Sequence, residues 1–306
     1  MRLSTCWGGS CTTAAKRPTD VQLRIIPRLD IKGPNLVKGI HFEGLRVLGK
    51  PENFARHYFD QGADELMYMD AVASLYGRNS LAPIIERTSR EVFIPLCVGG
   101  GLRSVDDIRT VLRAGADKVS LNTAAIARPD LIREASRAFG SSTIVVSIEA
   151  IRKPDGSYEA YTDYGRQASG QDAVQWAARA VELGAGELVV TSIDREGTAS
   201  GYDVTLTRTI AGLVPVPVIA GGGAGSIAHV CEVVRDGLAD AVSLASLIHY
   251  NRIRHAADSG DDFAAEGNIE FLRRGGTSSR HEDVTLRDIK RALHQTGIEC
   301  RFEEAS

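Results

Sequence analysis

Two carboxylates occupy matching positions in this chain. Asp30 follows the apolar segment Arg24–Leu29, and Glu149 follows the apolar segment Thr143–Ile148. Two carboxyl groups that face each other across a cavity suit general acid–base chemistry, in which one group gives a proton and the other takes one. A single acid at the end of a strand is more often a helix cap or an ion-pair partner. The paired placement favours a catalytic role for both.

Two glycine triplets form a second candidate site. Gly99–Gly101 and Gly221–Gly223 each follow an apolar segment and precede a helical one. Glycine lets backbone N–H groups approach an anion, and the following helix adds its positive end. One segment later comes a small polar pair, Asn122-Thr123 in one case and Ala245-Ser246 in the other. A triplet alone could be a tight turn, but two such sets predict two phosphate-binding cups and an elongated substrate with a phosphate at each end.

Four charged residues begin apolar segments, and in a barrel they would meet at the bottom. They are Arg24, Glu65, Lys118 and Glu187. The structural interpretation is a salt-bridged plug, because that face of a barrel usually serves stability. The functional interpretation is a gate on an axial passage.

An internal repeat determines how these residues are positioned. Ile94–Gly101 returns as Val216–Gly223, an offset of 122 residues from Pro95 to Pro217, and Asp117–Leu121 returns as Asp240–Leu244. Solenoid units are about 20–50 residues long, so this repeat indicates a duplicated half-domain.

Strands and helices alternate along the chain. The predicted strands are Arg24–Leu29, Glu65–Asp70, Ile94–Val98, Lys118–Leu121, Thr143–Ile148, Glu187–Ser192, Val216–Ala220 and Ala241–Leu244. The predicted helices are Pro51–Gln61, Leu81–Ser89, Val105–Ala114, Pro129–Phe139, Gly170–Leu183, Asp203–Gly212, Ser226–Asp236 and Thr285–Thr296. This alternation predicts a (β/α)8 TIM barrel, built from two similar half-barrels, with its active site at the carboxyl ends of the strands. The alternative is a doubly wound open sheet.

The composition of the chain limits the class of protein to which it can belong. The chain has 306 residues and a net charge of −3, which gives no electrostatic footprint for nucleic acid. It has no apolar run long enough to predict a membrane span. Five scattered cysteines predict reduced thiols in a cytoplasmic protein, with no metal site. No cofactor is expected.

One barrel domain is predicted over residues 23–306, preceded by a disordered extension over residues 1–22. A polar region at about 251–283 is expected as an insertion before the last helix, with a short helix at Asn268–Leu272. The insertion is either a solvated loop or a lid or partner-docking arm.

From Arg24 to Tyr250, and again in the last helix, the chain resembles the cyclase subunit of imidazole glycerol phosphate synthase. The segments that carry the resemblance are Arg24–Pro27, Leu29–Lys32, Val37–Gly39, Val98–Gly101, Gly115–Ala125, Thr191–Thr198, Ser200–Asp203 and Gly221–Gly225. The resemblance implies a barrel of two similar halves. A separate glutaminase subunit would bind at the amino-terminal face of the barrel and supply ammonia through it. At the top, ammonia would react with a bis-phosphate ribulosyl aminoimidazole-carboxamide nucleotide, giving imidazole glycerol phosphate and an aminoimidazole-carboxamide ribonucleotide for histidine and purine synthesis.

The resemblance also implies roles for individual residues. Asp30 and Glu149 fall on the acid–base pair, Lys38 on the lysine of a flexible loop, and Asp117 on a position facing the glutaminase. The implied phosphate ligands, with Gly222 added from the glycine motif, are Gly101, Asn122 and Thr123 at one end, and Gly197, Gly222, Gly223, Ala245 and Ser246 at the other. The implied ammonia gate is Arg24, Glu65, Lys118 and Glu187.

The chain departs from the family pattern at residues in and near the implied catalytic and phosphate-binding sites. Glu149 stands where the family has Asp, and a displacement of about 1 Å at a reacting group can cost about 100-fold in rate. Arg28 replaces a small cysteine inside the barrel. A buried arginine needs an anionic partner, for which Asp30 and Glu149 are candidates, and pairing would lower the pKa of each. Glu196 and Gly221 replace Asp and Ser in the second cup.

Three hypotheses follow. The first is the ammonia-dependent lyase and cyclase just described, with Asp30 as acid and Glu149 as base, or the reverse. The second is a paralogue that keeps a glutaminase partner but aminates another acceptor, for instance in amidino-sugar synthesis for surface polysaccharides. The third is a non-catalytic scaffold that only activates a glutaminase, with Arg28 blocking the barrel axis.

Overall fold

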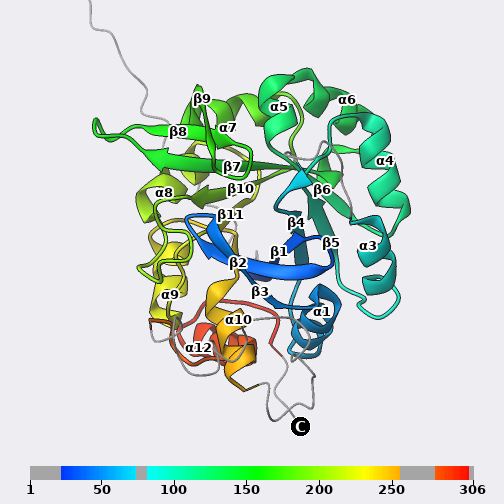
Figure 1. The fold of residues 1–306 in the computed structure, drawn as a ribbon. Coiled ribbons are helices and arrows are strands. Elements are labelled where there is room, and N and C mark those ends of the chain that lie inside the picture. The colour runs from blue at the N-terminus through cyan, green and yellow to red at the C-terminus, as the bar shows by residue number, and fades with distance from the viewer. Residues whose placement is uncertain (1–21, 74–80, 256–279, 303–306) are drawn as a thin grey trace, which may run out of the picture.

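The computed structural model describes residues 22–73, 81–255 and 280–302. Within these ranges, eight parallel strands close into a barrel with helices outside it (Figure 1). In order around the barrel, the strands are β1 (Arg24–Lys32), β4 (Leu66–Asp70), β5 (Leu96–Gly99), β6 (Lys118–Leu121), β7 (Ile144–Arg152), β10 (Glu187–Ser192), β11 (Val218–Gly221) and β12 (Ala241–Leu244). Pairing of β7 with β10 and of β12 with β1 completes the ring. The predicted barrel is confirmed, and the open sheet is wrong because no barrel strand is left at an edge.

The helices around the barrel match the predicted ones, with ends that differ by a few residues. They are α1 (Pro51–Asp60), α3 (Ala82–Thr88), α4 (Val105–Arg113), α6 (Asp130–Phe139), α7 (Ala173–Glu182), α8 (Val204–Leu213), α9 (Ile227–Arg235) and α12 (Leu286–Gln295). Side chains at the amino-terminal caps start several of them: Ser104 accepts from Asp107 N–H, and Ser226 accepts from His229 N–H. The Leu286 N–H donates to Gln61 Oε1, so α12 closes the helical layer beside α1.

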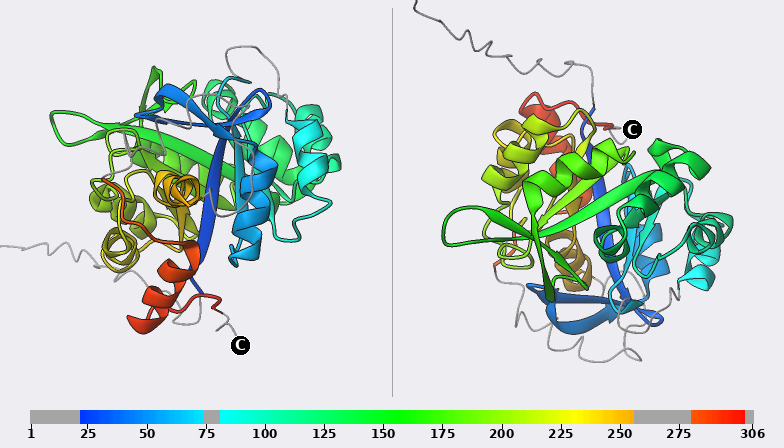
Figure 2. Two further views of the ribbon diagram at one scale, coloured as in Figure 1. Left: turned by 60° about the horizontal axis from the view of Figure 1, so that its bottom comes forward. Right: turned by 90° about the horizontal axis from the view of Figure 1, so that it is seen from above.

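Two strand hairpins extend β1 and β7, and the sequence patterns did not predict them. The first consists of β2 (Asn35–Ile40) and β3 (Glu43–Gly49), and the second of β8 (Tyr158–Thr162) and β9 (Gln167–Asp172). In each, the first strand pairs antiparallel with its barrel strand. Figure 2 shows the β2–β3 hairpin across one end of the barrel and the start of β1 at the other. The hairpin therefore covers the carboxyl ends of the strands, where the site was predicted.

The tips of these hairpins adopt the same unusual backbone conformation. His41 and Phe42 have φ of 52° and 63°, and Asp163 and Tyr164, each 122 residues later, have φ of 53° and 58°. Residues other than glycine rarely adopt this left-handed backbone conformation, so contacts with the surrounding residues must stabilise it. The Phe42 and Tyr164 rings pack at a centroid distance of 4.4 Å. His41 N–H donates to the Glu196 carbonyl. The first hairpin is thus docked on the second half of the barrel.

Alternation along β1 points every second side chain into the barrel: Arg24, Ile26, Arg28 and Asp30. The layer at the level of Ile26 and above is apolar and comprises Ile26, Met67, Met69, Cys97, Val145, Val189, Ile219 and Ala241. A larger apolar core lies between strands and helices. Charged side chains therefore lie below and above an apolar layer inside the barrel.

Two short helices follow directly after strands and were not predicted: α5 (Thr123–Ala127) after β6, and α10 (Ser246–Arg254) after β12. The last turn of α10 overlaps the start of the region predicted as an insertion at about 251–283. The short helix predicted at Asn268–Leu272 lies outside the described residues, as does the extension up to residue 21. In the described part of the chain, no helix has the length and apolarity needed to span a membrane.

Candidate active site

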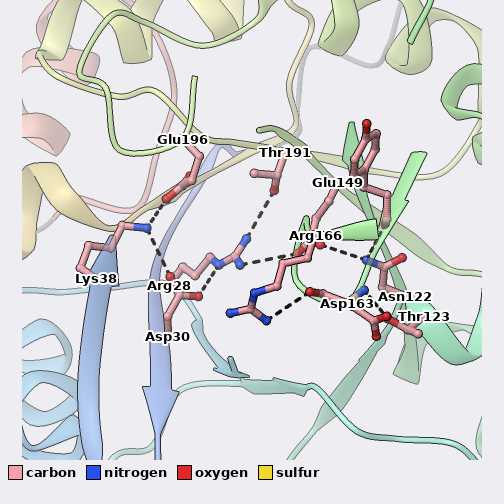
Figure 3. Close-up of polar contacts among 11 residues, drawn as sticks. Arg28, Asp30, Lys38, Asn122, Thr123, Glu149, Asp163, Arg166, Thr191 and Glu196 are labelled. Atoms are coloured by element: carbon pink, nitrogen blue, oxygen red, sulfur yellow. Dashed lines mark hydrogen bonds and ion pairs between the residues drawn. The ribbon is translucent and has the colours of Figure 1, made fainter. Parts of the chain in front are cut away.

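Arg28 joins the two predicted catalytic carboxylates (Figure 3). Its Nε lies 2.9 Å from Asp30 Oδ1, and its Nη2 lies 4.0 Å from Glu149 Oε1. Arg28 Nη1 is 3.4 Å from Thr191 Oγ1. Asp30 and Glu149 come from opposite sides of the barrel and are both buried. The structure therefore brings together the two acids that the sequence placed at matching strand ends.

The two carboxylates differ in protonation. Burial opposes ionisation of Asp30, but Arg28 and Lys38 outweigh it and hold the pKa of Asp30 below its usual value. Burial raises the pKa of Glu149 to about 7, and the more distant Arg28 only partly offsets this. The predicted lowering by Arg28 is thus right for Asp30 and wrong for Glu149, because desolvation exceeds a Coulombic attraction at 4.0 Å. Near neutral pH, Asp30 is an anion and Glu149 can hold a proton.

Lys38 lies on strand β2, not in a loop as the resemblance implied. Its Nζ is 3.2 Å from Asp30 Oδ2 and forms an ion pair with Glu196 Oε1. Burial disfavours the charge on Lys38, but Glu196 and Asp30 raise its pKa above the usual value. Charges thus alternate along one buried line, which runs Glu196, Lys38, Asp30, Arg28, Glu149.

The first predicted cup is an open cavity of about 320 Å³. Gly101, Asn122 and Thr123 line it together with Glu149. Asn122 Nδ2 donates to Glu149 Oε2 at 3.1 Å, so the cavity leads directly to that carboxyl group. Gly101 has φ of 70°, a conformation that favours glycine. A group bound here would lie next to the candidate acid.

The second predicted cup is assembled but nearly closed. Its lining contains all the predicted ligands, Gly197, Gly222, Gly223, Ala245 and Ser246, around a space of only about 20 Å³. Glu196 lines the same space, and its Oε2 lies 3.2 Å from where a Cβ on Gly222 would be. A carboxylate therefore occupies the edge of a cup that was predicted to bind phosphate.

The four charged residues at the lower end form a closed ring. Arg24 Nη1 and Lys118 Nζ lie 2.8 Å and 2.9 Å from Glu65 Oε2. Lys118 Nζ lies 3.0 Å from Glu187 Oε2, and Arg24 also pairs with Glu187. Each cation contacts both anions, which confirms that the predicted cluster exists. The apolar layer lies between this ring and Arg28.

Tyr164 and Phe42 belong to the site, although sequence reasoning missed both. Tyr164 lines the first cavity, and its hydroxyl helps to lower the pKa of Asp30. The Phe42 ring lies 5.1 Å from the guanidinium carbon of Arg28. Extending the 122-residue repeat to the hairpin tips would have paired these aromatic residues. Among the described residues, no three His, Cys, Asp or Glu side chains cluster as metal ligands.

Two comparisons identify relatives of this chain. A family model described as "Histidine biosynthesis protein" matches residues 24–254, a range that contains every barrel strand and both carboxylates. A Legionella pneumophila protein named imidazole glycerol phosphate synthase subunit HisF is 55% identical over 205 residues, covering 67% of this chain and 97% of that protein. The chain therefore belongs to the HisF family, the cyclase subunits of imidazole glycerol phosphate synthase in histidine biosynthesis.

Proposed function

We propose that this chain uses ammonia to cleave and cyclise a bis-phosphate ribulosyl aminoimidazole-carboxamide nucleotide. The products are imidazole glycerol phosphate and an aminoimidazole-carboxamide ribonucleotide. The observation that carries the proposal is the pair Asp30 and Glu149, gathered on one guanidinium beside a glycine-lined cavity. One is held as an anion and the other can be protonated near neutral pH.

The protonation states assign the roles. Asp30 stays ionised and accepts a proton, so it serves as the base. Glu149, whose pKa is raised to about 7, donates a proton and serves as the acid. Of the two assignments that the sequence left open, the electrostatics favour this one. Lys38 stabilises the anion of Asp30 from the opposite side.

The first cup would hold one phosphate through Gly101, Asn122 and Thr123, close to Glu149. The second phosphate would enter the cup around Gly222 and Gly223 after Glu196 moves aside.

Ammonia would enter through the lower ring and come from a glutaminase subunit docked on that face. Three large apolar side chains are exposed near the amino-terminal ends of strands: Phe93 at 77%, Leu213 at 52% and Leu238 at 39%. Phe93 borders a hollow of about 430 Å³ that Asp117 also lines. A highly exposed aromatic side chain at the edge of a hollow fits a protein partner. Phe93→Asp should weaken binding of the glutaminase subunit, measured by titration calorimetry, without changing activity on ammonium salt.

The test of the reaction uses purified protein, the bis-phosphate nucleotide and an ammonium salt. Wild-type protein should form imidazole glycerol phosphate, and Asp30→Asn or Glu149→Gln should each lower kcat by at least about 100-fold, the usual contribution of a general acid or base. The exposed Asp106→Asn is the matched control. If wild-type protein and a Glu149→Asp variant both form no product, the proposal is wrong.

A second function, amination of a different acceptor, is favoured by one observation. The second cup has a space of only about 20 Å³ and a carboxylate at its edge, which suits an acceptor with a single phosphate. Parallel assays of acceptors with one and with two phosphates distinguish the functions. Faster turnover of the singly phosphorylated acceptor would support this second function.

A further inference from the structure

Arg28 keeps one donor unsatisfied in the deepest part of the site. Its side chain is 2% exposed, and Nη2 has no hydrogen-bond partner among the described residues. Glu149 Oε1, at 4.0 Å, is too distant for a direct hydrogen bond but close enough for one small molecule to contact both groups. Leaving a buried donor without a partner is unfavourable, because its desolvation is not compensated by a hydrogen bond. Such a group in a native site is typical of a place where a ligand or a buried water binds.

Two buried hydroxyl groups show the same lack of partners. Ser120 Oγ and Ser147 Oγ have no hydrogen-bond partner within the described ranges. Alternation along β6 and β7 points both side chains into the barrel, one inward position below Asn122 and Glu149 respectively. Hydroxyl oxygens accept hydrogen bonds, as does the Glu149 carboxyl group. The barrel interior just below the acid–base pair thus offers the Arg28 Nη2 donor, two serine hydroxyls that can donate or accept, and the Glu149 carboxyl group as an acceptor.

The position of Arg28 along the barrel axis determines from which end of the barrel a ligand reaches it. Along β1 the inward positions run from Arg24 in the charged ring through Ile26 in the apolar layer to Arg28, and then Asp30. A molecule moving up the axis meets Arg28 before Asp30. From above, the Phe42 ring covers the guanidinium and packs on Tyr164.

We propose that Arg28 binds ammonia by donating an Nη2 hydrogen to the lone pair of NH3. The bound ammonia in turn donates hydrogen bonds to Glu149 and the serine hydroxyls. This inference rests on the proposed ammonia-dependent function. Ammonia has one lone pair, which the Arg28 donor can bind, and three N–H groups, which the Glu149 carboxyl group and the serine hydroxyls can accept. Ammonium has no lone pair, and the positive guanidinium repels it. Arg28 thereby selects the nucleophilic form immediately below the acceptor.

The experiment measures the KM for ammonia and the KM for the bis-phosphate nucleotide separately, with concentrations expressed as free NH3. Arg28→Met should raise the KM for ammonia at least about tenfold, the cost of one hydrogen bond from a charged donor. The KM for the nucleotide should change much less. Arg28→Lys, which keeps a charge and a donor, should recover part of the loss. The matched control is Thr191→Val, which removes the partner of Nη1 and leaves Nη2 in place.

The possible failures are distinguishable. An inactive wild-type protein would overturn the proposed function and this inference with it. An active wild-type protein whose Arg28→Met variant keeps the normal KM for ammonia would overturn this inference alone. So would a rise confined to the KM for the nucleotide, because Nη2 would then bind the acceptor. Thermal unfolding checks that each variant is folded; if Arg28→Met is not, Arg28→Lys and Ser147→Ala should each raise the KM for ammonia, and a normal value in both would reject the inference.

Discussion

The two glycine cups share a backbone design and differ in what fills them. Each has a glycine triplet followed by a serine-capped helix, with Ser104 and Ser226 122 residues apart. The residues that precede α5 and α10 match closely, Asn122 at φ −135° and ψ −90°, Ala245 at φ −131° and ψ −89°. Yet the first cup opens into about 320 Å³ and the second encloses about 20 Å³. The same backbone thus produces one open and one filled site.

The first hairpin contacts the second cup through Glu196. Its Lys38 pairs with Glu196 at the second cup, and its His41 N–H donates to the Glu196 carbonyl. The second hairpin contributes Tyr164 to the first cavity. The glycine turn is thus common to both cups, while the second cup has in addition a carboxylate that is paired with a residue from a distant segment.

The largest expected effect is a loss of stability when a side chain is added to the backbone of the second cup. A Cβ on Gly223, whose φ is 106°, would lie 2.1 Å from the Gly201 carbonyl oxygen. Gly223→Ala should therefore lower the free energy of unfolding by about 4 kcal/mol, since it adds a clash to a conformational penalty. Gly156→Ala is the control, with φ of 86° and open space around it, and should cost only about 1 kcal/mol. Equal costs in urea denaturation would show that the second cup is not tightly built.

The two carboxylates should respond oppositely to neutralisation. The folded state raises the pKa of Glu149 from 4.5 to about 7, so its contribution to stability is full below pH 4.5 and is lost as pH rises to about 7. At pH 8 the free energy of unfolding of Glu149→Gln should therefore exceed that of the wild type by roughly 3 kcal/mol, since each pKa unit corresponds to about 1.4 kcal/mol. This difference should vanish near pH 4. Asp30→Asn should be destabilising at pH 8, because it removes the partner of Arg28 and Lys38. A stabilising Asp30→Asn would refute the assigned difference.

Glu196 can be tested as the group that keeps the second cup closed. Glu196→Gln removes a negative charge beside Gly222 and breaks the ion pair between Lys38 and Glu196, while Lys38 keeps its ion pair with Asp30. Inorganic phosphate should bind about tenfold more tightly than to wild type at low ionic strength. Titration calorimetry measures this, with the exposed Asp106→Asn as control. Unchanged phosphate affinity would mean that side-chain charge is not what separates the two cups.

The smallest expected effect is the loss of stability on removing a helix cap, and it should be equal for the equivalent helices of the two half-barrels. Ser104 Oγ accepts from Asp107 N–H at 3.1 Å, and Ser226 Oγ accepts from His229 N–H at 3.3 Å. Ser104→Ala and Ser226→Ala should each cost about 1 kcal/mol of unfolding free energy, as is typical for an amino-terminal cap. Thermal unfolding of the two variants should therefore give matching shifts. A large difference would show that the equivalence of the halves is limited to backbone shape.

The sequence by itself determined the barrel and the residues that line its two ends. Alternation of apolar strands with helices leaves few architectures, and in a parallel barrel all carboxyl ends meet at one face. Asp30, Glu149 and the glycine triplets could therefore be assigned to one end, and the ring containing Arg24 and Lys118 to the other. These inferences need only position along the chain and a side-chain period of two.

Only the tertiary structure decided how the site residues behave. The raised pKa of Glu149 depends on exclusion of water and on its 4.0 Å separation from Arg28. The ion pair at the edge of the second cup forms because a hairpin brings Lys38 to Glu196 from 158 residues away in the chain. Desolvation and ion pairing are set by distances between segments remote in sequence, and neither composition nor spacing contains those distances.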